Sequence, residues 1–560
     1  MIADTVRAWF SHGTGTDFAH LAEEYSAEKL VREVMRQFPD MNGQASVATR
    51  LRGLKLFPRK GGSIRTVAFF YYRAYNGGSE MVMSRLSGFF ARAGYRIVLL
   101  TDFPPNEADY PFPKGTERYI LPDTFRLTEE SRQERFECFR RALEESGADV
   151  LIYNAWLSRN LLWDLLAVHA AGVPFVAYIH GAFTCQFVQG NPDEMDQLYQ
   201  ITRILGLADH IVSLSRTFNH FWSQFNPSTT ALLDPCSAPD AADPAVKRDP
   251  NLLLWVGRIH PEKQTLEAVR ILDEVRKKIP AVRLKIVGGT DEAYRPYEAE
   301  VRQMIIARGL ENAVSLEGYC EQVGKCYQEA ALLLMTSAHE GFGLVIAEAK
   351  TYGLPCVAYD LPYSYFTEDG RGFYTVPQRD AKAAAEKVSR LLQDQEAMQE
   401  ARKLALESAK AYSEPQLTEQ WKEIFRKLEA PAGGMCSGGY ERVWINALLE
   451  DAHLGFVRLE NREGECRKKE AGGWLSAIFS ADYYSEKYPD LKAAFGSDDL
   501  RLLQHFLEYG MSEGRQACAD FNVLAYRERY DDLRQAFGED IKAYYFHYLL
   551  HGCREGRSGK

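Results

Sequence analysis

Between residues 63 and 240, short apolar runs alternate with segments whose apolar residues recur at helical spacing. The apolar runs have the pattern of buried strands, and they are Ile64–Tyr72, Arg96–Thr101, Asp149–Asn154, Phe175–Ile179 and His210–Leu214. Strands that alternate with helices form a parallel sheet covered on both faces. The pattern therefore predicts an α/β, Rossmann-like domain over residues 63–240.

A second series of the same kind begins at Asn251. Its expected strands are Leu252–Val256, Leu284–Val287 and Cys356–Tyr359. Helices are expected from about Thr265 to Lys278, from Asp380 to Leu392 and from Glu396 to Leu428. We therefore expect a second Rossmann-like domain over residues 241–429.

Two flanking stretches do not follow this alternation. Residues 1–62 are expected to be a helical extension, because Phe18 to Phe38 has helical periodicity. Within it, Arg50–Lys60 mixes five basic residues with Leu and Phe, which suits an anionic membrane surface or, alternatively, a solvated linker packed on the next domain. Residues 430–473 are rich in glycine around one expected helix, Tyr440–Leu449, and are interpreted as a linker with a docked helix.

Residues 474–560 contain an internal repeat at an offset of 42 residues. The offset pairs Phe479 with Phe521, Tyr484 with Tyr526, His505 with His547, and Glu513-Gly514-Arg515 with Glu555-Gly556-Arg557. Two copies of one small helical unit, packed on each other around their aromatic residues, explain the match. We expect each His to be a structural hydrogen-bonding group, and each Glu-Gly-Arg to be a helix stop with an internal ion pair.

Composition limits the class of protein. A chain of 560 residues with 46% apolar and 26% charged residues can bury several large cores, and its net charge of −10 argues against generic nucleic-acid binding. The ten cysteines contain no C-x-x-C pair and are interpreted as cytosolic thiols. No secretory signal or membrane-spanning run is found in the sequence, so we expect a cytoplasmic protein that is soluble or peripheral to the membrane.

The most informative stretch runs from Ser337 to Asp360. A turn containing Gly341 and Gly343 leads into an Ala- and Glu-rich helix, with Glu340 just before the helix and Glu348 within it, and seven residues lie between these two acids. Free amides in a helix's first turn and the positive end of its dipole favour an anionic ligand, and glycines let the backbone approach it. A phosphate flanked by two acids that bind hydroxyl groups indicates a nucleotide-sugar site. Two solvated acids on an amphipathic helix are the alternative.

These residues resemble the retaining family-4 glycosyltransferases, which have the GT-B fold of two facing Rossmann-like domains. The family signature E-G-F-G-L-x-x-x-E-A-x-x-x-G-x-P matches E-G-F-G-L-V-I-A-E-A-K-T-Y-G-L-P from Glu340 to Pro355. The resemblance implies that Glu340 binds the donor sugar ring and Glu348 the ribose hydroxyls, with Gly341, Phe342, Gly343 and Leu344 around the donor. It also implies that the last helix of the second domain returns to the first.

The loop after Leu252–Val256 carries candidate phosphate ligands. Arg258 offers a planar fork of donors and Lys263 a mobile charge ahead of a helix. The family form of this loop is G-R-x-x-x-x-K-G, with the Arg and the Lys on the phosphates. Gln264 stands where the family has Gly, which leaves the path of the loop open. Two surface cations at a strand end are the alternative.

Other site candidates follow strand ends, where ligands of α/β sheets bind. Gly77 and Gly78 lie in a loop that resembles the family's G-G-x-E loop, and His180 follows the strand at Phe175–Ile179, where the family has a donor-contacting His. A buried structural histidine is the alternative at that position. Val314–Tyr319 resembles the family's V-x-F-x-G strand, and by the same resemblance Gly289 and Tyr319 are candidates for contact with the nucleotide.

The sequence therefore predicts a retaining, hexosyltransferase-type glycosyltransferase that uses a UDP- or GDP-sugar and a glycan, lipid-linked or protein acceptor, as in bacterial polysaccharide synthesis. As proposed for the family, the leaving phosphate oxygen would take the acceptor's proton. We expect no cofactor and no metal, because no Asp-x-Asp ends a strand and the phosphates already have cationic partners. The repeat suggests acceptor capture, partner docking or self-association. The alternatives are another GT-B enzyme, namely a sugar-nucleotide epimerase or a phosphorylase, and a non-catalytic GT-B scaffold.

Overall fold

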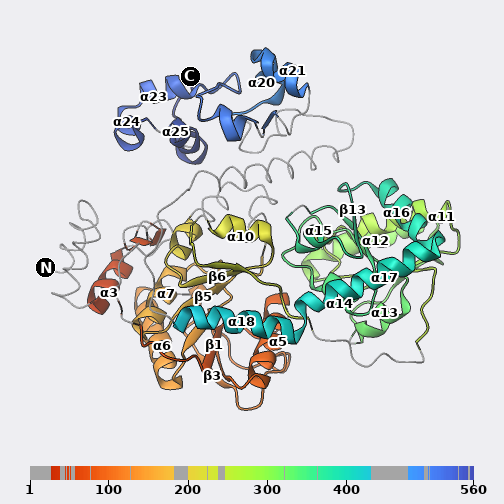
Figure 1. Cartoon of the computed structure of the whole chain (residues 1–560), viewed down its shortest axis with the longest axis horizontal. Helices are drawn as coiled ribbons and strands as arrows, with labels where there is room; N and C mark the ends of the chain where they lie inside the picture. Colours follow the sequence, from red (N-terminus) through yellow and green to blue (C-terminus); the bar gives the residue numbers. More distant parts are fainter. Residues whose placement is uncertain are drawn as a thin grey trace. The chain divides into compact units, whose positions relative to one another are not determined.

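The computed structural model describes the chain in two compact units, one ending at residue 429 and one beginning at residue 477 (Figure 1). The residues it describes are 27–37, 44–45, 47–48, 51, 57, 59–75, 77–126, 128–181, 200–223, 225–236, 246–320, 322–361, 363–429, 477–496, 502–503, 505–539, 541–552 and 555–560.

The first domain is built on a seven-stranded parallel sheet with the strand order β3-β2-β1-β4-β5-β6-β7. Its strands are β1 Thr66–Phe70, β2 Arg96–Thr101, β3 Glu117–Ile120, β4 Val150–Tyr153, β5 Phe175–Tyr178, β6 His210–Ser213 and β7 Thr229–Ala231. Every residue of β1, β4, β5 and β6 is buried, as expected for strands covered on both faces.

The helices around this sheet are α5 Gly78–Arg92, α6 Glu129–Ser146, α7 Leu161–Ala170 and α10 Arg216–Ser223, and α3 Ala27–Gln37 packs against α7 (Figure 1). Local chemistry fixes the bounds of α6: Thr128 and Ser131 form a capping box at its start, and Gly147 ends it in the left-handed conformation. Buried Arg135 of α6 forms ion pairs with Asp102, at 2.6 Å, and with Asp164 of α7, at 2.9 Å. These contacts tie both helices to the end of β2.

The second domain has a six-stranded parallel sheet with the order β10-β9-β8-β11-β12-β13. Its strands are β8 Leu252–Val256, β9 Arg283–Val287, β10 Val314–Leu316, β11 Leu332–Met335, β12 Cys356–Tyr359 and β13 Phe373–Val376. The helices around it are α11 Thr265–Arg276, α12 Arg295–Ala307, α13 Val323–Glu329, α14 Leu344–Thr351, α15 Tyr365–Asp369, α16 Ala381–Gln393 and α17 Gln395–Ala409. The expected α/β class with two Rossmann-like domains is thus confirmed.

Helix α18, Glu414–Glu429, returns to the first domain (Figure 1, cyan). Its Trp421 and Phe425 rings lie 5.6 and 5.4 Å from the ring of Phe90 in α5, and the Glu429 carboxylate accepts the Ile64 amide at 2.8 Å. The sequence predicted one helix from Glu396 to Leu428, but a short 3-10 turn, Lys410–Tyr412, separates α17 from α18. The break lets the chain leave the second domain.

The C-terminal unit is helical, and the same contacts occur in it twice, 42 residues apart. Its helices are α20 Ala481–Lys487, α21 Pro489–Phe495, α23 Val523–Arg529, α24 Asp531–Phe537 and α25 Ile541–His547. The Tyr484 hydroxyl lies 3.1 Å from His505 Nδ1, and the Tyr526 hydroxyl lies 3.0 Å from His547 Nδ1. Each histidine therefore has the structural hydrogen bond that the sequence suggested.

Four strands, β3, β7, β11 and β13, were not identified from the sequence. Helix α3 falls inside the helical pattern expected at Phe18–Phe38. Most of the basic segment Arg50–Lys60 and the whole linker with its expected helix Tyr440–Leu449 lie outside the described residues. Among the described helices, none combines the length and the apolar character that crossing a membrane requires.

Candidate active site

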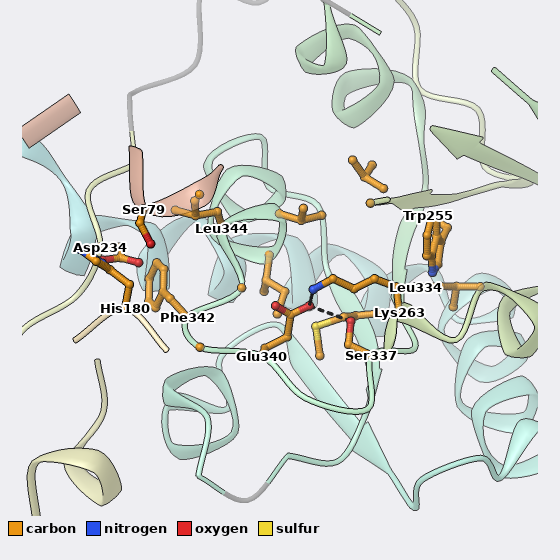
Figure 2. Close-up of a pocket in the computed structure, with 18 residues that line it drawn as sticks. Ser79, His180, Asp234, Trp255, Lys263, Leu334, Ser337, Glu340, Phe342 and Leu344 are labelled. Carbon is orange, nitrogen blue, oxygen red and sulfur yellow. Dashed lines mark hydrogen bonds and ion pairs between the residues drawn. The ribbon is translucent and has the colours of Figure 1, made fainter. Parts of the chain in front are cut away.

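A cavity of about 280 Å³ lies at the carboxyl ends of strands from both sheets (Figure 2). The first domain contributes the start of α5 and the loops after β5 and β7, and the second contributes β8, β11 and the turn into α14. The lining residues are Gly78, Ser79, His180, Asp234, Trp255, Val256, Gly257, Lys263, Leu334, Met335, Ser337, Glu340, Gly341, Phe342, Gly343, Leu344, Val345 and Ile346. Eight of the residues predicted from the sequence are among them.

An ion pair stands at the centre of the cavity wall. Lys263 Nζ lies 2.6 Å from Glu340 Oε1, and the Ser337 hydroxyl donates to the same oxygen at 2.7 Å (Figure 2). Burial opposes ionisation of Glu340, but Lys263 and Ser337 outweigh it and hold the pKa of this carboxyl below its ordinary value of 4.5. Glu340 is therefore a carboxylate at neutral pH. The second oxygen of this carboxylate carries no bond to Lys263 or Ser337.

The loops that carry this pair are bonded to each other. The Ala338 amide donates to the Glu262 carbonyl at 2.7 Å, and the Thr336 hydroxyl donates to the Lys263 carbonyl at 2.7 Å. Thr336 in turn accepts the buried Trp255 indole N–H at 2.9 Å. The loop after β8 and the loop after β11 therefore form one connected wall.

Two glycines of the Glu340 motif have steric reasons to be glycine. A Cβ atom on Gly341 would lie 2.0 Å from the His180 carbonyl oxygen, so backbone of the second domain touches backbone of the first at this point. Gly343 precedes α14 with a φ of 87°, in the left-handed region that non-glycine residues rarely adopt. The motif thus brings the start of α14 close to the first domain.

Two helix N-termini meet at the cavity. Gly78 begins α5 and Leu344 begins α14, and a Cβ atom on Gly78 would lie 3.4 Å from the Leu344 side chain. The first amides of a helix have no partner within the helix and carry the positive end of its dipole. Together with Lys263, these two helix starts make this part of the wall suited to an anion.

His180 lies in the wall between two acceptor groups. Its Nδ1 is 2.9 Å from Asp234 Oδ1 and its Nε2 is 2.8 Å from Asn154 Oδ1. The Asn154 amide nitrogen donates to the Phe70 carbonyl at 3.1 Å, which orients its oxygen towards the ring. Both ring nitrogens thus lie within hydrogen-bond distance of side-chain oxygens, which fixes the orientation of the ring.

Glu348 lies on α14 outside the cavity lining and has two partners. Arg85 of α5 donates to its Oε1 at 2.7 Å, and the Tyr327 hydroxyl of α13 lies 3.1 Å from its Oε2. Burial opposes the charge of Arg85, but Glu348 outweighs it and raises the pKa of the guanidinium. The pair connects the two domains beside the cavity.

The remaining predicted residues also lie outside the cavity lining. Gly77 caps α5, and Arg258 is largely exposed beside Asp291, whose carboxylate is 3.3 Å away. Gly289 accepts the Ile259 amide at 2.8 Å, and Tyr319 is 84% exposed. These loops follow β8, β9 and β10, so they lie at the same edge of the sheet as the cavity. Their roles stay predictions.

Several residues at the site were not singled out as site residues from the sequence, and they are Ser79, Asn154, Asp234, Trp255, Ser337, Arg85 and Tyr327. Ser79 and Ser337 stand in stretches that the sequence analysis singled out, so a signal existed for these two. For Arg85 and Tyr327 no sequence signal existed. Among the described residues, no group of three or more His, Cys, Asp or Glu side chains is placed to hold a metal ion.

Comparison with known families matches the two domains separately. Residues 76–228 match the model described as Glycosyltransferase Family 4, and residues 239–408 match the model described as Glycosyl transferases group 1. The first range covers strands β2 to β6, and the second covers strands β8 to β13. Together they support a group 1/family 4 glycosyltransferase.

Individual relatives are distant. A poly(glycerol-phosphate) alpha-glucosyltransferase of Bacillus subtilis is 30% identical over 184 residues, which cover 32% of this chain and 27% of that protein. A GDP-mannose:cellobiosyl-diphosphopolyprenol alpha-mannosyltransferase of Xanthomonas oryzae is 28% identical over 244 residues, which cover 41% of this chain and 62% of that protein. The matched stretch is thus less than two thirds of either relative.

Among solved structures, Anabaena HepE in complex with UDP and glucose aligns with a TM-score of 0.52 and 16% identity, covering 65% of this chain and 99% of that chain. At 16% identity the alignment shows similarity of the fold alone. The expected GT-B arrangement of the two domains is confirmed.

Proposed function

We propose that this chain, whose two domains match family 4 and group 1 glycosyltransferases, transfers a hexosyl group from a UDP- or GDP-sugar to a glycan, lipid-linked or protein acceptor. The observation that carries the proposal is the cavity in which the Lys263–Glu340 pair faces the starts of α5 and α14. A nucleotide-sugar needs cationic partners for its diphosphate and hydroxyl ligands for its sugar, and this wall offers both.

The residues divide between the two ends of the donor. We assign the diphosphate to Lys263 and to the free amides at the starts of the two helices, because charge accumulates there as the leaving group departs. We assign the sugar ring to Glu340, whose carboxylate could also stabilise an oxocarbenium-like transition state. Binding would require Lys263 to move towards a phosphate or to share its charge between the phosphate and Glu340.

We propose that transfer retains the anomeric configuration. The bond between the anomeric carbon and the phosphate oxygen breaks, and the acceptor oxygen attacks the same face of the sugar. The leaving phosphate oxygen then takes the proton that the acceptor hydroxyl loses, so no protein base is consumed. Lys263 and the helix starts supply the positive charge that stabilises the diphosphate, and we therefore expect transfer to proceed without an added metal.

The relatives allow more than one donor. The Xanthomonas relative is named for GDP-mannose, and HepE was solved with UDP and glucose. The names of the Bacillus and Xanthomonas relatives point to bacterial polymers and lipid-linked glycans, so we propose an acceptor of this class.

Thermal shift with UDP, GDP, ADP and their common sugars, with and without EDTA, identifies the donor, because a ligand that binds the native state raises the melting temperature. Transfer is then measured with the selected sugar, and NMR of the product reports the anomer. Glu340→Gln keeps the size of the side chain but removes its charge, so we expect about a 100-fold or greater loss of kcat with nucleotide binding retained. Wild-type rates in this variant would refute the assignment of Glu340, and an inverted product would refute retention.

A further inference from the structure

Gln264 stands directly after Lys263 and has an unusual backbone conformation. Its φ and ψ are 48° and 49°, in the left-handed region, and it precedes the first residue of α11. A non-glycine residue is held in this region only when its surroundings compensate for the strain. Glycine would adopt this conformation freely, so the Gln side chain itself requires an explanation.

The side chain of Gln264 is buried and fully engaged. It is 5% exposed, its Oε1 accepts Arg379 Nε at 2.7 Å, and its Nε2 donates to Gln378 Oε1 at 3.1 Å. Arg379 has a φ of 58° and is the other non-glycine residue with positive φ in the part of the chain that the structure describes. The two strained residues are therefore bonded to each other.

Gln378 extends this bonding to the loop that carries Glu340. Its Nε2 donates to the Ser337 carbonyl and to the Asp360 carbonyl, each at 3.1 Å. The Ser337 hydroxyl donates to Glu340 Oε1, the same oxygen that Lys263 binds. A chain of side-chain hydrogen bonds thus runs from the residue after Lys263 to the residue that orients Glu340.

We infer that Gln264, Gln378 and Arg379 are positioning residues for the transfer, an inference that rests on the proposed function. The three side chains, called the glutamine bridge below, fix the Lys263 loop against the Glu340 loop. None of them lines the cavity, so they act through Lys263 and Glu340 rather than on the donor. The cation for the leaving diphosphate and the carboxylate for the sugar can act on one donor only when their relative position is fixed. A displacement of about 1 Å can cost about 100-fold in rate.

Two variants break the bridge in different ways. Gln378→Leu keeps the volume of the side chain but removes the link to Ser337. Gln264→Asn tolerates the left-handed backbone but is too short to reach Gln378 and Arg379. The matched control is Tyr359→Phe, because the Tyr359 hydroxyl donates to Glu267 of α11 at 2.7 Å in the same domain, and neither residue lines the cavity. The control removes one buried hydrogen bond and leaves the bridge intact.

Hydrogen exchange at residues 336–343 and steady-state kinetics with the donor give two separate measurements. We expect both bridge variants to exchange faster at 336–343 and to lose about 10-fold to 100-fold in kcat, with a smaller change in the KM of the donor. Tyr359→Phe should lower the melting temperature about as much as the bridge variants do. It should change neither the exchange at residues 336–343 nor kcat. If one bridge variant does not fold, the other still tests whether the bridge positions the Glu340 loop.

Exchange at 336–343 and kcat values that match those of Tyr359→Phe would overturn the positioning role, because the bridge would then act on stability alone. If the wild type transfers no sugar from any donor, the proposed function fails instead, and the exchange measurement still decides whether the bridge holds the Glu340 loop.

Discussion

Gly341 places backbone of the second domain against the carbonyl of His180. A Cβ atom would lie 2.0 Å from that oxygen, and backbone atoms cannot rotate away as a flexible side chain can. Gly341→Ala should therefore push the Glu340 turn and the His180 loop apart. We expect about a 100-fold loss of kcat/KM for transfer, measured at a temperature well below the melting transition.

Gly88→Ala is the matched control for this substitution. Gly88 lies within α5, and its added Cβ would meet only the movable end of the Arg92 side chain, at 3.3 Å. Since alanine favours helix, this variant should be as active as the wild type and at least as stable. Equal activity in the Gly341 and Gly88 variants would show that the contact at His180 does not set the site geometry.

His210 makes the first domain sensitive to acid. It is buried in β6 with Nδ1 2.8 Å from the Ser228 hydroxyl and Nε2 3.0 Å from the Thr230 hydroxyl, and burial, helped by Lys427, lowers its pKa from 6.5 to about 4. Between these pH values the His210 imidazole is therefore protonated in the unfolded chain and neutral in the folded chain. The free energy of unfolding should fall as pH drops from about 6.5, and below about pH 4 the loss reaches roughly 3 kcal/mol.

Urea unfolding of the wild type and of His210→Gln across this pH range measures the effect. The variant should lose less stability on acidification, whereas His220→Gln, at an exposed position on α10, should follow the wild type. Parallel pH profiles for the wild type and His210→Gln would exclude His210 as the source of the acid sensitivity.

At the scale of elements, the sequence was informative where apolar runs are bounded by glycine or polar residues. Strands β2, β8 and β12 have the predicted bounds, because each contains a continuous apolar run and ends at a loop. Strand β3 is half-exposed, and β7 has three residues and no fully buried side chain, so neither carries the pattern of a buried strand. These two are the edge strands of the sheet, where packing requires fewer apolar residues.

The candidate site was predictable to the extent that its residues lie in local motifs. The Glu340 turn is one continuous motif, and the structure places it in the cavity wall. The partner of Glu348 is Arg85, which is 263 residues away in the chain and belongs to the other domain. A contact of this kind depends on how α5 and α14 are brought together, and no local pattern encodes it.

The Arg85–Glu348 pair between α5 and α14 yields a prediction of its own. Both side chains are only 19% exposed, so removing Arg85 leaves a half-buried carboxylate with Tyr327 as its remaining described partner. If Glu348 binds the ribose, its orientation depends on this pair. We expect Arg85→Met to weaken nucleotide binding by about 10-fold, measured by calorimetry with the nucleotide that the thermal shift selects.

Arg92→Met provides the comparison on the same helix. Arg92 pairs with Glu414 at 2.6 Å, but its side chain is 60% exposed, and exposed pairs contribute little. Nucleotide affinity should be unchanged in this variant. An unchanged affinity in Arg85→Met as well would mean that the pair serves only to join the domains.

At the scale of the whole molecule, the described chain has separate hydrophobic cores. The core of the second Rossmann-like domain is aliphatic, with residues such as Leu253, Ile271 and Val357, whereas the core of the C-terminal unit is largely aromatic, with Tyr484, Phe521 and Tyr526. Cores that share no residues can unfold independently. We expect calorimetry to resolve one transition for the unit up to residue 429 and another for the unit from residue 477.

A ligand and a variant assign these two transitions. A nucleotide at 100 times its dissociation constant adds about 2.7 kcal/mol to the stability of the unit that binds it, so the transition of the first unit should rise by a few degrees and the other should stay. Gly510→Ala should act on the C-terminal unit instead, because its Cβ would lie 2.3 Å from the Tyr484 hydroxyl and disrupt the Tyr484–His505 contact. The variant should lower only the transition of the C-terminal unit and leave sugar transfer unchanged. A single transition that moves with both changes would show that the two units unfold as one, and loss of transfer in Gly510→Ala would assign the C-terminal unit a part in the reaction.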